Sequence, residues 1–148
     1  METRDCFHFG ESGEIMKNAR REAIRIPDAW HSGAPYTPAI RAGSFVFISG
    51  AVSYDLESGK SVGVDIREQT IQVLNNIEAI LAQCGLTTDD VVKTTVFLTD
   101  CSLASEMNEV YSVRFKTPYP ARSTVQVGPL ARPEYLIEIE AIALDPLR

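Results

Sequence analysis

The sequence is poor in the residues from which metal centres and disulfide frameworks are built. It has two histidines, His8 and His31, and three cysteines, Cys6, Cys84 and Cys101, among 148 residues. No two cysteines form a CxxC pair, so neither a zinc centre nor a disulfide framework is predicted. Unpaired cysteines fit a reducing compartment, and we therefore expect a cytoplasmic protein that holds no metal.

Positive charge and long hydrophobic runs are also scarce. The formal net charge is −6, and the only concentrated basic run lies within residues 17–25. Binding to nucleic acid phosphates without sequence preference needs a basic face, so the charge balance argues against nucleic acid as a partner. The longest weakly polar run, residues 44–54, is too short to cross a bilayer. The N-terminus is charged where a secretory signal would be apolar, so no membrane or secretory segment is expected.

The remaining composition is that of one globular domain. Hydrophobic residues make up 45% of the 148 residues, enough for one domain with one core. Residues 1–33 combine a glycine-containing turn with a basic amphipathic stretch and show no regular pattern, so we assign them to an N-terminal extension. Residues 34–148 are assigned to a single domain.

Hydrophobic periodicity predicts strands interleaved with two helices. From their β-branched and aromatic composition, strands are expected at residues 45–52, 91–98, 122–128 and 135–144. One helix is expected over residues 66–84, between a capping Asp65 and a terminating Gly85. A second is expected over residues 102–115, before Pro118. With a closing antiparallel hairpin of the last two strands, this pattern predicts an α+β sheet with both helices on one face.

Two charged residues, Arg122 and Glu138, stand inside the last two predicted strands. Strand residues alternate between faces, so Glu138 and Glu140 line the face opposite Ile137 and Ile139. Either these carboxylates lie on a wetted outer face, where they discourage aggregation between sheets, or a nearby cation keeps them ionised in a functional site. A sheet with an uncovered face is often buried by oligomerisation.

Five stretches of the sequence carry a more specific signal. They are Phe47–Gly50, Val92–Asp100, Asn108–Tyr111, Pro120–Ser123 and Ile137–Ala143. In this order they resemble the RidA/YjgF family of enamine and imine deaminases, and the resemblance runs from about residue 35 to residue 144.

The resemblance implies a chorismate-mutase-like α+β fold, in which a mixed sheet carries two helices on one face. It also implies a homotrimer whose sheets form a central barrel, with the sites in the clefts between subunits. The implied activity is hydrolytic, needs no cofactor, and converts 2-imino or enamine acids into 2-oxo acids with release of ammonia. The implied partners are a small carboxylate substrate and further copies of this chain, with no membrane.

The resemblance also implies roles for individual residues. Arg122 would clamp the substrate carboxylate in bidentate fashion, and Glu138 would orient and deprotonate the attacking water. Tyr36, Ser49 and Asn108 match further cleft positions, where they would shape the pocket or bond to the substrate. This chemistry is physically sufficient, because a protonated imine is already electrophilic and needs only an anchor, a placed water and a base.

Thr124 departs from the family pattern, since better-known members carry a cysteine two residues after the arginine. The neighbouring main-chain carbonyl is thought to help hold the water in those members, so loss of the thiol is compatible with hydrolysis. The substituted position, grouped here with the substrate-binding residues, leaves the identity of the substrate open. Together with residues 65–70 and 133–146, this threonine resembles the 2-aminomuconate deaminase branch of the family.

Two functions of other classes remain open at this point. The first is an RNA-cleaving or translation-inhibiting protein, an activity also attributed to relatives, against which the acidic charge weighs. The second is a non-catalytic trimer that binds small carboxylates or partner proteins, with Arg122 as an effector clamp. The sequence does not name the imine or enamine, the pathway, or the role of residues 1–33.

Overall fold

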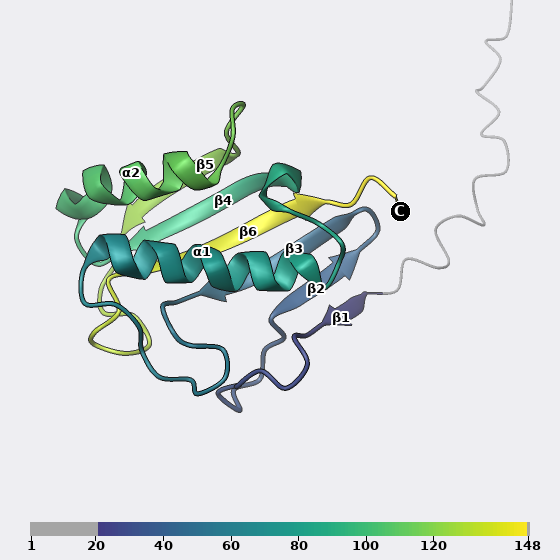
Figure 1. Ribbon diagram of the computed structural model, residues 1–148, viewed down its shortest axis with the longest axis horizontal. Coiled ribbons are helices and arrows are strands. Elements are labelled where there is room, and N and C mark those ends of the chain that lie inside the picture. Colours follow the sequence, from purple (N-terminus) through teal and green to yellow (C-terminus); the bar gives the residue numbers. More distant parts are fainter. Residues whose placement is uncertain (1–20, 148) are drawn as a thin grey trace, which may run out of the picture.

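The computed structural model describes residues 21–147, which form one mixed sheet with two α-helices on the same face (Figure 1). The sheet order is β1-β2-β3-β6-β4-β5, and only β4 and β5 run parallel. The predicted α+β fold is confirmed, and the trimeric barrel stays a prediction. The strands are β1 (Glu22–Ile24), β2 (Ala39–Ala42), β3 (Phe45–Ala51), β4 (Val91–Leu98), β5 (Ala121–Gln126) and β6 (Ile137–Leu144). The helices are α1 (Ile66–Ala82), α2 (Ala104–Arg114) and two short 3-10 turns, η2 (Thr88–Asp90) and η3 (Cys101–Leu103).

Part of the predicted N-terminal extension lies outside the described residues. Cys6, His8 and the first residues of the basic run, 17–20, belong to that part. β1 falls within the segment assigned to the extension and joins the sheet, where Ala23 pairs with Ile40 of β2. The boundary between residues 33 and 34 stays a prediction.

The predicted hairpin between the last two strands is wrong, because β6 lies between β3 and β4. Ile139 of β6 pairs with Ala51 on one side and Val96 on the other, while β5 pairs in parallel with the far edge of β4. β6 alternates buried and exposed residues along its whole length, whereas β5 is exposed at most positions. The strand with more apolar surface to bury therefore takes the interior position, and the polar strand takes the edge.

Helix α1 packs its apolar side on the centre of the sheet. Its N-cap Asp65 accepts a hydrogen bond from the Glu68 amide at 2.9 Å, and Glu68 in turn accepts from the Val64 amide at 2.8 Å. The cap resembles the predicted capping box, shifted back by one residue at its second bond. Val73, Leu74, Ile77 and Leu81 are fully buried against the sheet. None of the described helices is long and apolar enough to cross a membrane.

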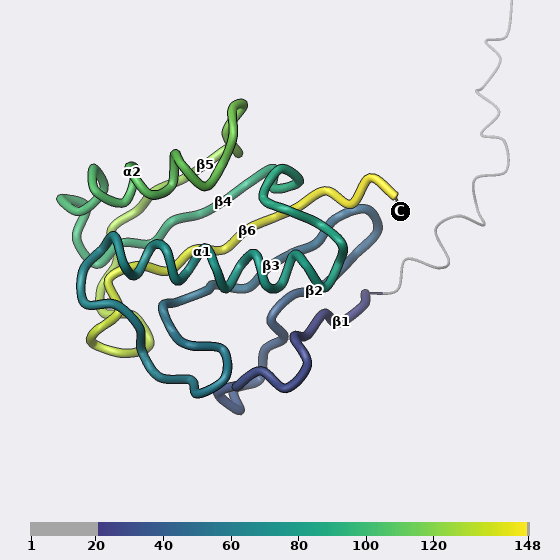
Figure 2. Tube along the Cα trace, in the orientation of Figure 1, coloured from purple at the N-terminus to yellow at the C-terminus, as the bar shows by residue number. Residues whose placement is uncertain are grey.

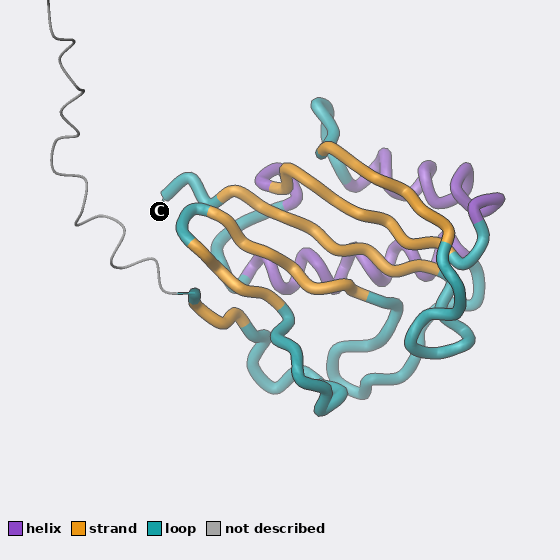
Figure 3. The backbone as a smooth tube through the Cα atoms, turned by 180° about the vertical axis from the view of Figure 1, so that it is seen from behind, coloured by secondary structure: helices purple, strands orange, loops and turns teal. Residues whose placement is uncertain are grey.

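Within the described residues no helix covers the other face of the sheet, as Figure 3 shows from behind. Glu138 and Glu140 lie on this face, as predicted, since the residues that alternate with them, Ile137 and Ile139, are buried on the helix side. The same face carries large apolar side chains that are 39% to 45% exposed, namely Phe45, Phe47, Val125 and Leu144. Such a patch on a sheet is typical of an interaction surface.

Two long loops, residues 52–65 and 127–136, meet at one end of the sheet (Figure 2). Buried amides of α1 hold both. Gln69 donates to the Glu134 carbonyl at 2.8 Å and accepts from the Leu136 amide at 2.8 Å. Asn76 donates to two carbonyls of the first loop, those of residues 52 and 54, at 3.0 and 2.9 Å. Both loops are therefore fixed to the helix by bonds that are shielded from water.

Candidate functional site

Arg122 lines a hollow of about 430 Å³ at the edge of the sheet, where β5 runs beside α2. We call it the arginine hollow, and its walls are Asn108, Tyr111, Ser112, Tyr119, Pro120 and Arg122. The structure thus brings Arg122 and Asn108 together, two of the residues that the resemblance had selected. Pro120 stands directly before β5, which then carries Arg122 in register with Thr94 of β4.

The arginine is held by an aromatic face and not by a carboxylate. Its guanidinium carbon lies 4.7 Å from the centre of the Tyr111 ring, a cation–π contact. Tyr111 is buried and shares a hydrogen bond of 2.7 Å with the Thr94 hydroxyl, which fixes the ring. Burial raises the pKa of the Tyr111 phenol, while the bond to Thr94 and the charge of Arg122 act in the opposite direction. Within residues 21–147 Arg122 makes no ion pair, so its fork is free to bind an anion.

Glu138 lines a second hollow, of about 480 Å³, at the end of the sheet where the two long loops meet. We call it the glutamate hollow. Its walls include Tyr36, Ser49, Gly50, Tyr54, Arg132 and Glu138. Three of the residues selected by the resemblance, Tyr36, Ser49 and Glu138, therefore share one cavity.

The Glu138 carboxylate is half-buried and has no neutralising partner within residues 21–147. Burial raises the pKa of this carboxyl, and the negative charge of Glu140 raises it further. Among the described residues, no hydrogen bond or ion pair engages it. A carboxylate with a raised pKa is a stronger base than an ordinary one and suits proton abstraction from water.

A bulge in β3 makes room for Glu138. Ile48 pairs with Ala141 and Ala51 with Ile139, so Ser49 and Gly50 together oppose the single residue 140. A β-carbon at Gly50 would overlap the Glu138 carboxylate, which therefore lies against the bare backbone of this glycine. Only glycine allows the carboxylate to take this position.

Ser49 ties the segment that carries Tyr36 to the sheet. Its hydroxyl donates to the Thr37 carbonyl at 2.7 Å, and its amide donates to the Pro38 carbonyl at 2.9 Å. The hydroxyl proton is thereby used within the chain, so Ser49 can offer a substrate only the lone pairs of its oxygen. Tyr36 is half-exposed and stands at the rim of the glutamate hollow.

The two hollows lie on different faces of the sheet. Arg122 shares the helix-covered face with its buried neighbour Thr94, whereas Glu138 stands on the uncovered face beside Phe97. Thr124 lies on the same face as Arg122 but is not among the residues lining either hollow. Arg122 and Glu138 of one chain therefore lie in separate hollows and do not meet.

Gly50, Trp30 and Arg132 belong to the glutamate hollow but were not selected from the sequence. A glycine inside a strand pattern is a signal for a bulge or a close contact, so Gly50 could have been found. Trp30 is the only tryptophan, and Arg132 stands in a turn next to a proline. Neither position shows a periodicity that would place it in a cavity.

The described residues offer little for a metal ion. No group of three or more histidine, cysteine, aspartate or glutamate side chains is gathered within residues 21–147. Burial raises the pKa of the Cys84 thiol, which contacts the Ile80 carbonyl at 3.9 Å and packs against the core. Cys84 thus behaves as a small apolar residue.

The chain is similar in sequence and fold to known proteins. The family model described as Endoribonuclease L-PSP matches residues 26–145. A RutC family protein of Pyrococcus horikoshii is 46% identical over 123 residues, which cover 83% of this chain and 97% of that protein. Reactive Intermediate Deaminase A, chloroplastic, of Arabidopsis thaliana is 40% identical over 135 residues, covering 91% of this chain and 72% of that protein. The crystal structure of a Rid family protein of unknown function from Yersinia pestis superimposes with a TM-score of 0.79 at 40% identity, covering 84% of this chain and 99% of that one.

Proposed function

We propose that this chain, which belongs to the family described as Endoribonuclease L-PSP, is a hydrolytic deaminase of 2-imino or enamine acids. Its resemblance to RidA/YjgF predicted this family. A relative of 40% identity bears the name of a reactive intermediate deaminase, which supports an enzymatic role for the family. The products would be a 2-oxo acid and ammonia.

One observation carries the proposal: a cation suited to anchor a carboxylate and a carboxylate suited to act as a base both lie in hollows of the chain, but the two hollows are separate. The arginine hollow offers a carboxylate anchor and the Asn108 amide, and the glutamate hollow offers a base with a raised pKa. The uncovered sheet face carries exposed apolar side chains beside Glu138. We propose a homotrimer in which this face is buried and the arginine hollow of one copy lies against the glutamate hollow of the next.

In such a shared site the reaction proceeds by addition and elimination. Arg122 binds the substrate carboxylate through two parallel hydrogen bonds and fixes the adjacent imine carbon. Glu138 takes a proton from a water molecule, whose oxygen bonds to that carbon while the C=N electrons pass to nitrogen. Glu138 returns this proton to the nitrogen, which converts the amino group into a leaving group. The hydroxyl proton then passes to Glu138 as the C=O bond forms and the C–N bond breaks, and ammonia is released. No oxidant or cofactor enters this balance.

The proposal is tested by ammonia release from a 2-imino acid made in place by an amino acid oxidase, measured above the uncatalysed rate. Loss of the two charge-assisted bonds in Arg122→Gln is expected to lower kcat/KM by about 100-fold or more. Arg114→Gln is the matched control, because Arg114 pairs with Glu78 at 3.0 Å, and neither residue lines the two hollows. Full activity in Arg122→Gln would show that this arginine does not anchor the substrate.

Binding assays on the purified protein distinguish the deaminase from the two alternative functions. Binding of 2-oxo acids through Arg122 without turnover of any imine would show a carboxylate-binding protein and not an enzyme. Steeply salt-dependent binding of RNA by the pure protein would support a ribonuclease, which the net charge of −6 argues against.

A further inference from the structure

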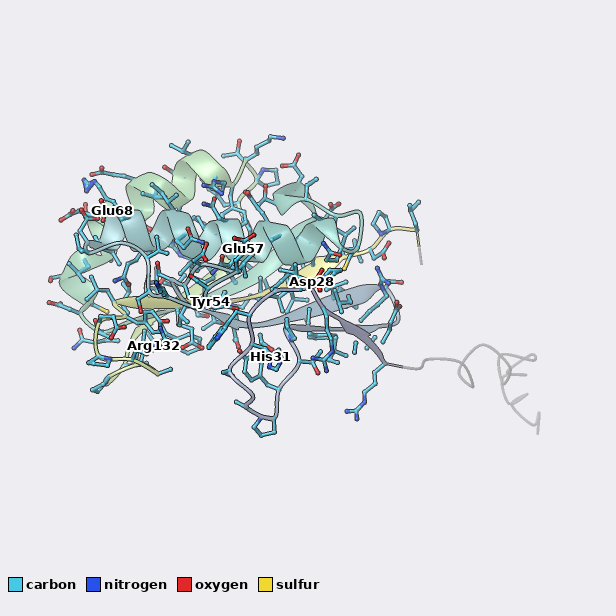
Figure 4. All side chains as sticks on the ribbon, turned by 60° about the horizontal axis from the view of Figure 1, so that its bottom comes forward. Asp28, His31, Tyr54, Glu57, Glu68 and Arg132 are labelled. Carbon is cyan, nitrogen blue, oxygen red and sulfur yellow. The ribbon has the colours of Figure 1, made fainter. Side chains whose placement is uncertain are left out.

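The glutamate hollow contains a second arginine that the proposed reaction does not use. The guanidinium carbon of Arg132 lies 5.7 Å from the ring centre of Trp30 and 5.7 Å from that of Tyr135. Figure 4 shows Arg132 and Tyr54 on the same side of α1, below the helix in that view. Arg132, Tyr54 and Glu138 all line the same hollow. A cation thus stands in the cavity that holds the base.

The hydrogen bonds of Arg132 leave most of its guanidinium unused. Among the residues that the structure describes, it donates only through Nη1, to the Gly59 carbonyl at 3.0 Å and to the Ser61 hydroxyl at 3.2 Å. The hydrogen bond from Ser61, at 2.5 Å, lowers the pKa of the nearby Glu134 carboxyl, and the charge of Arg132 has a smaller effect in the same direction, although the two side chains form no ion pair. Within the described part of the chain, no carboxylate lies within ion-pair distance of this half-buried cation, so an anion from outside would find its donors free.

The side chain of Arg132 is held in place by its surroundings. Gly59, whose φ is +68°, lies so close to the Trp30 ring that a β-carbon there would collide with it. The residues that flank Tyr135 on either side are both bonded to Gln69 of α1. Arg132 is therefore fixed between two aromatic rings and a backbone carbonyl, and a fixed cation loses little entropy when it binds an anion.

We propose that Arg132 binds a second carboxylate, at the far end of the substrate, so that the preferred substrates are 2-imino or enamine dicarboxylic acids. This inference rests on the proposed deaminase function, in which Arg122 holds the carboxylate next to the reacting carbon. Glu138 then acts at the carbon next to that carboxylate, and Arg132 holds the far end of the substrate. Tyr36 and Tyr54 supply apolar wall for the carbon chain between the two carboxylates.

The test compares two imines of equal chain length that differ at the far end. One is made in place from glutamate and the other from norvaline, each by a suitable amino acid oxidase, and kcat/KM is measured for both. A charge-assisted hydrogen bond that only the diacid can make is expected to give the wild-type protein a preference of about 10-fold or more for the glutamate imine.

Variants at the two arginines separate the far-end contact from the anchor. Arg132→Gln is expected to lower kcat/KM for the glutamate imine by about 10- to 100-fold and to leave the norvaline imine within about twofold. Arg132→Lys, which keeps the charge but loses the planar fork, is expected to fall between. Arg122→Gln is expected to lower kcat/KM for both imines, and Arg114→Gln is expected to lower it for neither.

The outcomes distinguish failure of this inference from failure of the proposed function. Equal turnover of the two imines by the wild-type protein would overturn the inference and leave the deaminase intact. So would an equal loss on both imines in Arg132→Gln, because this would show that Arg132 only braces the loops. Turnover of neither imine would overturn the proposed function itself. If Arg132→Gln does not fold, the wild-type ratio decides alone, and stronger inhibition by 2-oxoglutarate than by 2-oxopentanoate would support the inference.

Discussion

Substitution of Gly50 by alanine is expected to displace the Glu138 carboxylate without changing its chemical identity. The added methyl carbon would lie 2.7 Å from Cδ and 3.0 Å from Cγ of Glu138 and would overlap Oε1. To reach van der Waals distance, the carboxylate has to move by about 1 Å or more. A misplacement of this size at a reacting group costs about 100-fold in rate, so kcat is expected to fall by that factor.

The stability of the Gly50→Ala protein is expected to change little. The colliding atoms are at the far end of a flexible side chain, and a shifted rotamer costs about 1 kcal/mol. The backbone angle φ of Gly50 is not in the left-handed region, so alanine meets no strain there. Gly128→Ala is the matched control, because Gly128 is also outside that region and its added methyl would meet no atom within 4 Å.

The assay pairs ammonia release with urea denaturation of the same three proteins. The expected result is a large loss of activity in Gly50→Ala alone, with unfolding free energies that agree within about 1 kcal/mol across the wild-type protein and both variants. Activity of Gly50→Ala within twofold of the wild-type value would refute the placement of the base. A loss of several kcal/mol in Gly50→Ala would also refute the reasoning, because it would show that the carboxylate cannot move aside.

Three further outcomes follow from charges in the structure. Because burial and then Glu140 raise the pKa of Glu138, kcat/KM is expected to rise with pH through an ionisation above the ordinary glutamate value of about 4.3, and Glu140→Gln is expected to move this ionisation to lower pH. Because the pKa of Glu138 is raised in the folded protein, its protonated form stabilises the fold at pH below the ordinary glutamate pKa, and this contribution is lost as pH rises through the folded-state pKa. In urea titrations, Glu138→Gln is therefore expected to become more stable relative to the wild-type protein as pH rises. Arg41 and Asp145 form a buried ion pair at 3.2 Å, with side chains 10% and 6% exposed, so Asp145→Asn is expected to cost about 3 kcal/mol in urea unfolding, whereas Glu22→Gln, whose side chain is 54% exposed, should cost under about 1 kcal/mol.

Local signals in the sequence predict both α-helices and the strands β3, β4, β5 and β6, but not the short strands β1 and β2. The helix that begins after Asp65 and the strand around Ile139 are set by periodicity and capping, which act over a few residues. The partner of each strand is a long-range property. The turn residues after β5 indicate a reversal of the chain but not that β6 passes over β4 to reach the interior of the sheet.

Part of the candidate site could likewise be predicted from the sequence, and part depends on long-range packing. The family motif selected Arg122 and Glu138 as chemical groups, but it did not show that β5 and β6 present them on different faces. Gly50 and Arg132 depend on a bulge and on contacts between two loops, and neither has a periodic pattern in the sequence. A glycine inside a strand pattern indicates a bulge at Gly50, but its contact with Glu138 and the position of Arg132 follow from tertiary packing.

The central claim is that a working site takes the arginine hollow from one copy and the glutamate hollow from another. Mixing inactive subunits tests this most directly. Arg122→Gln and Glu138→Gln chains, each inactive alone, are refolded together in equal amounts, with separately refolded chains combined afterwards as the control. In a trimer with shared sites, random assembly gives about one quarter of the sites an intact arginine and an intact glutamate, so about a quarter of wild-type activity is expected to return. No recovery in a mixture shown to contain mixed oligomers would contradict the account.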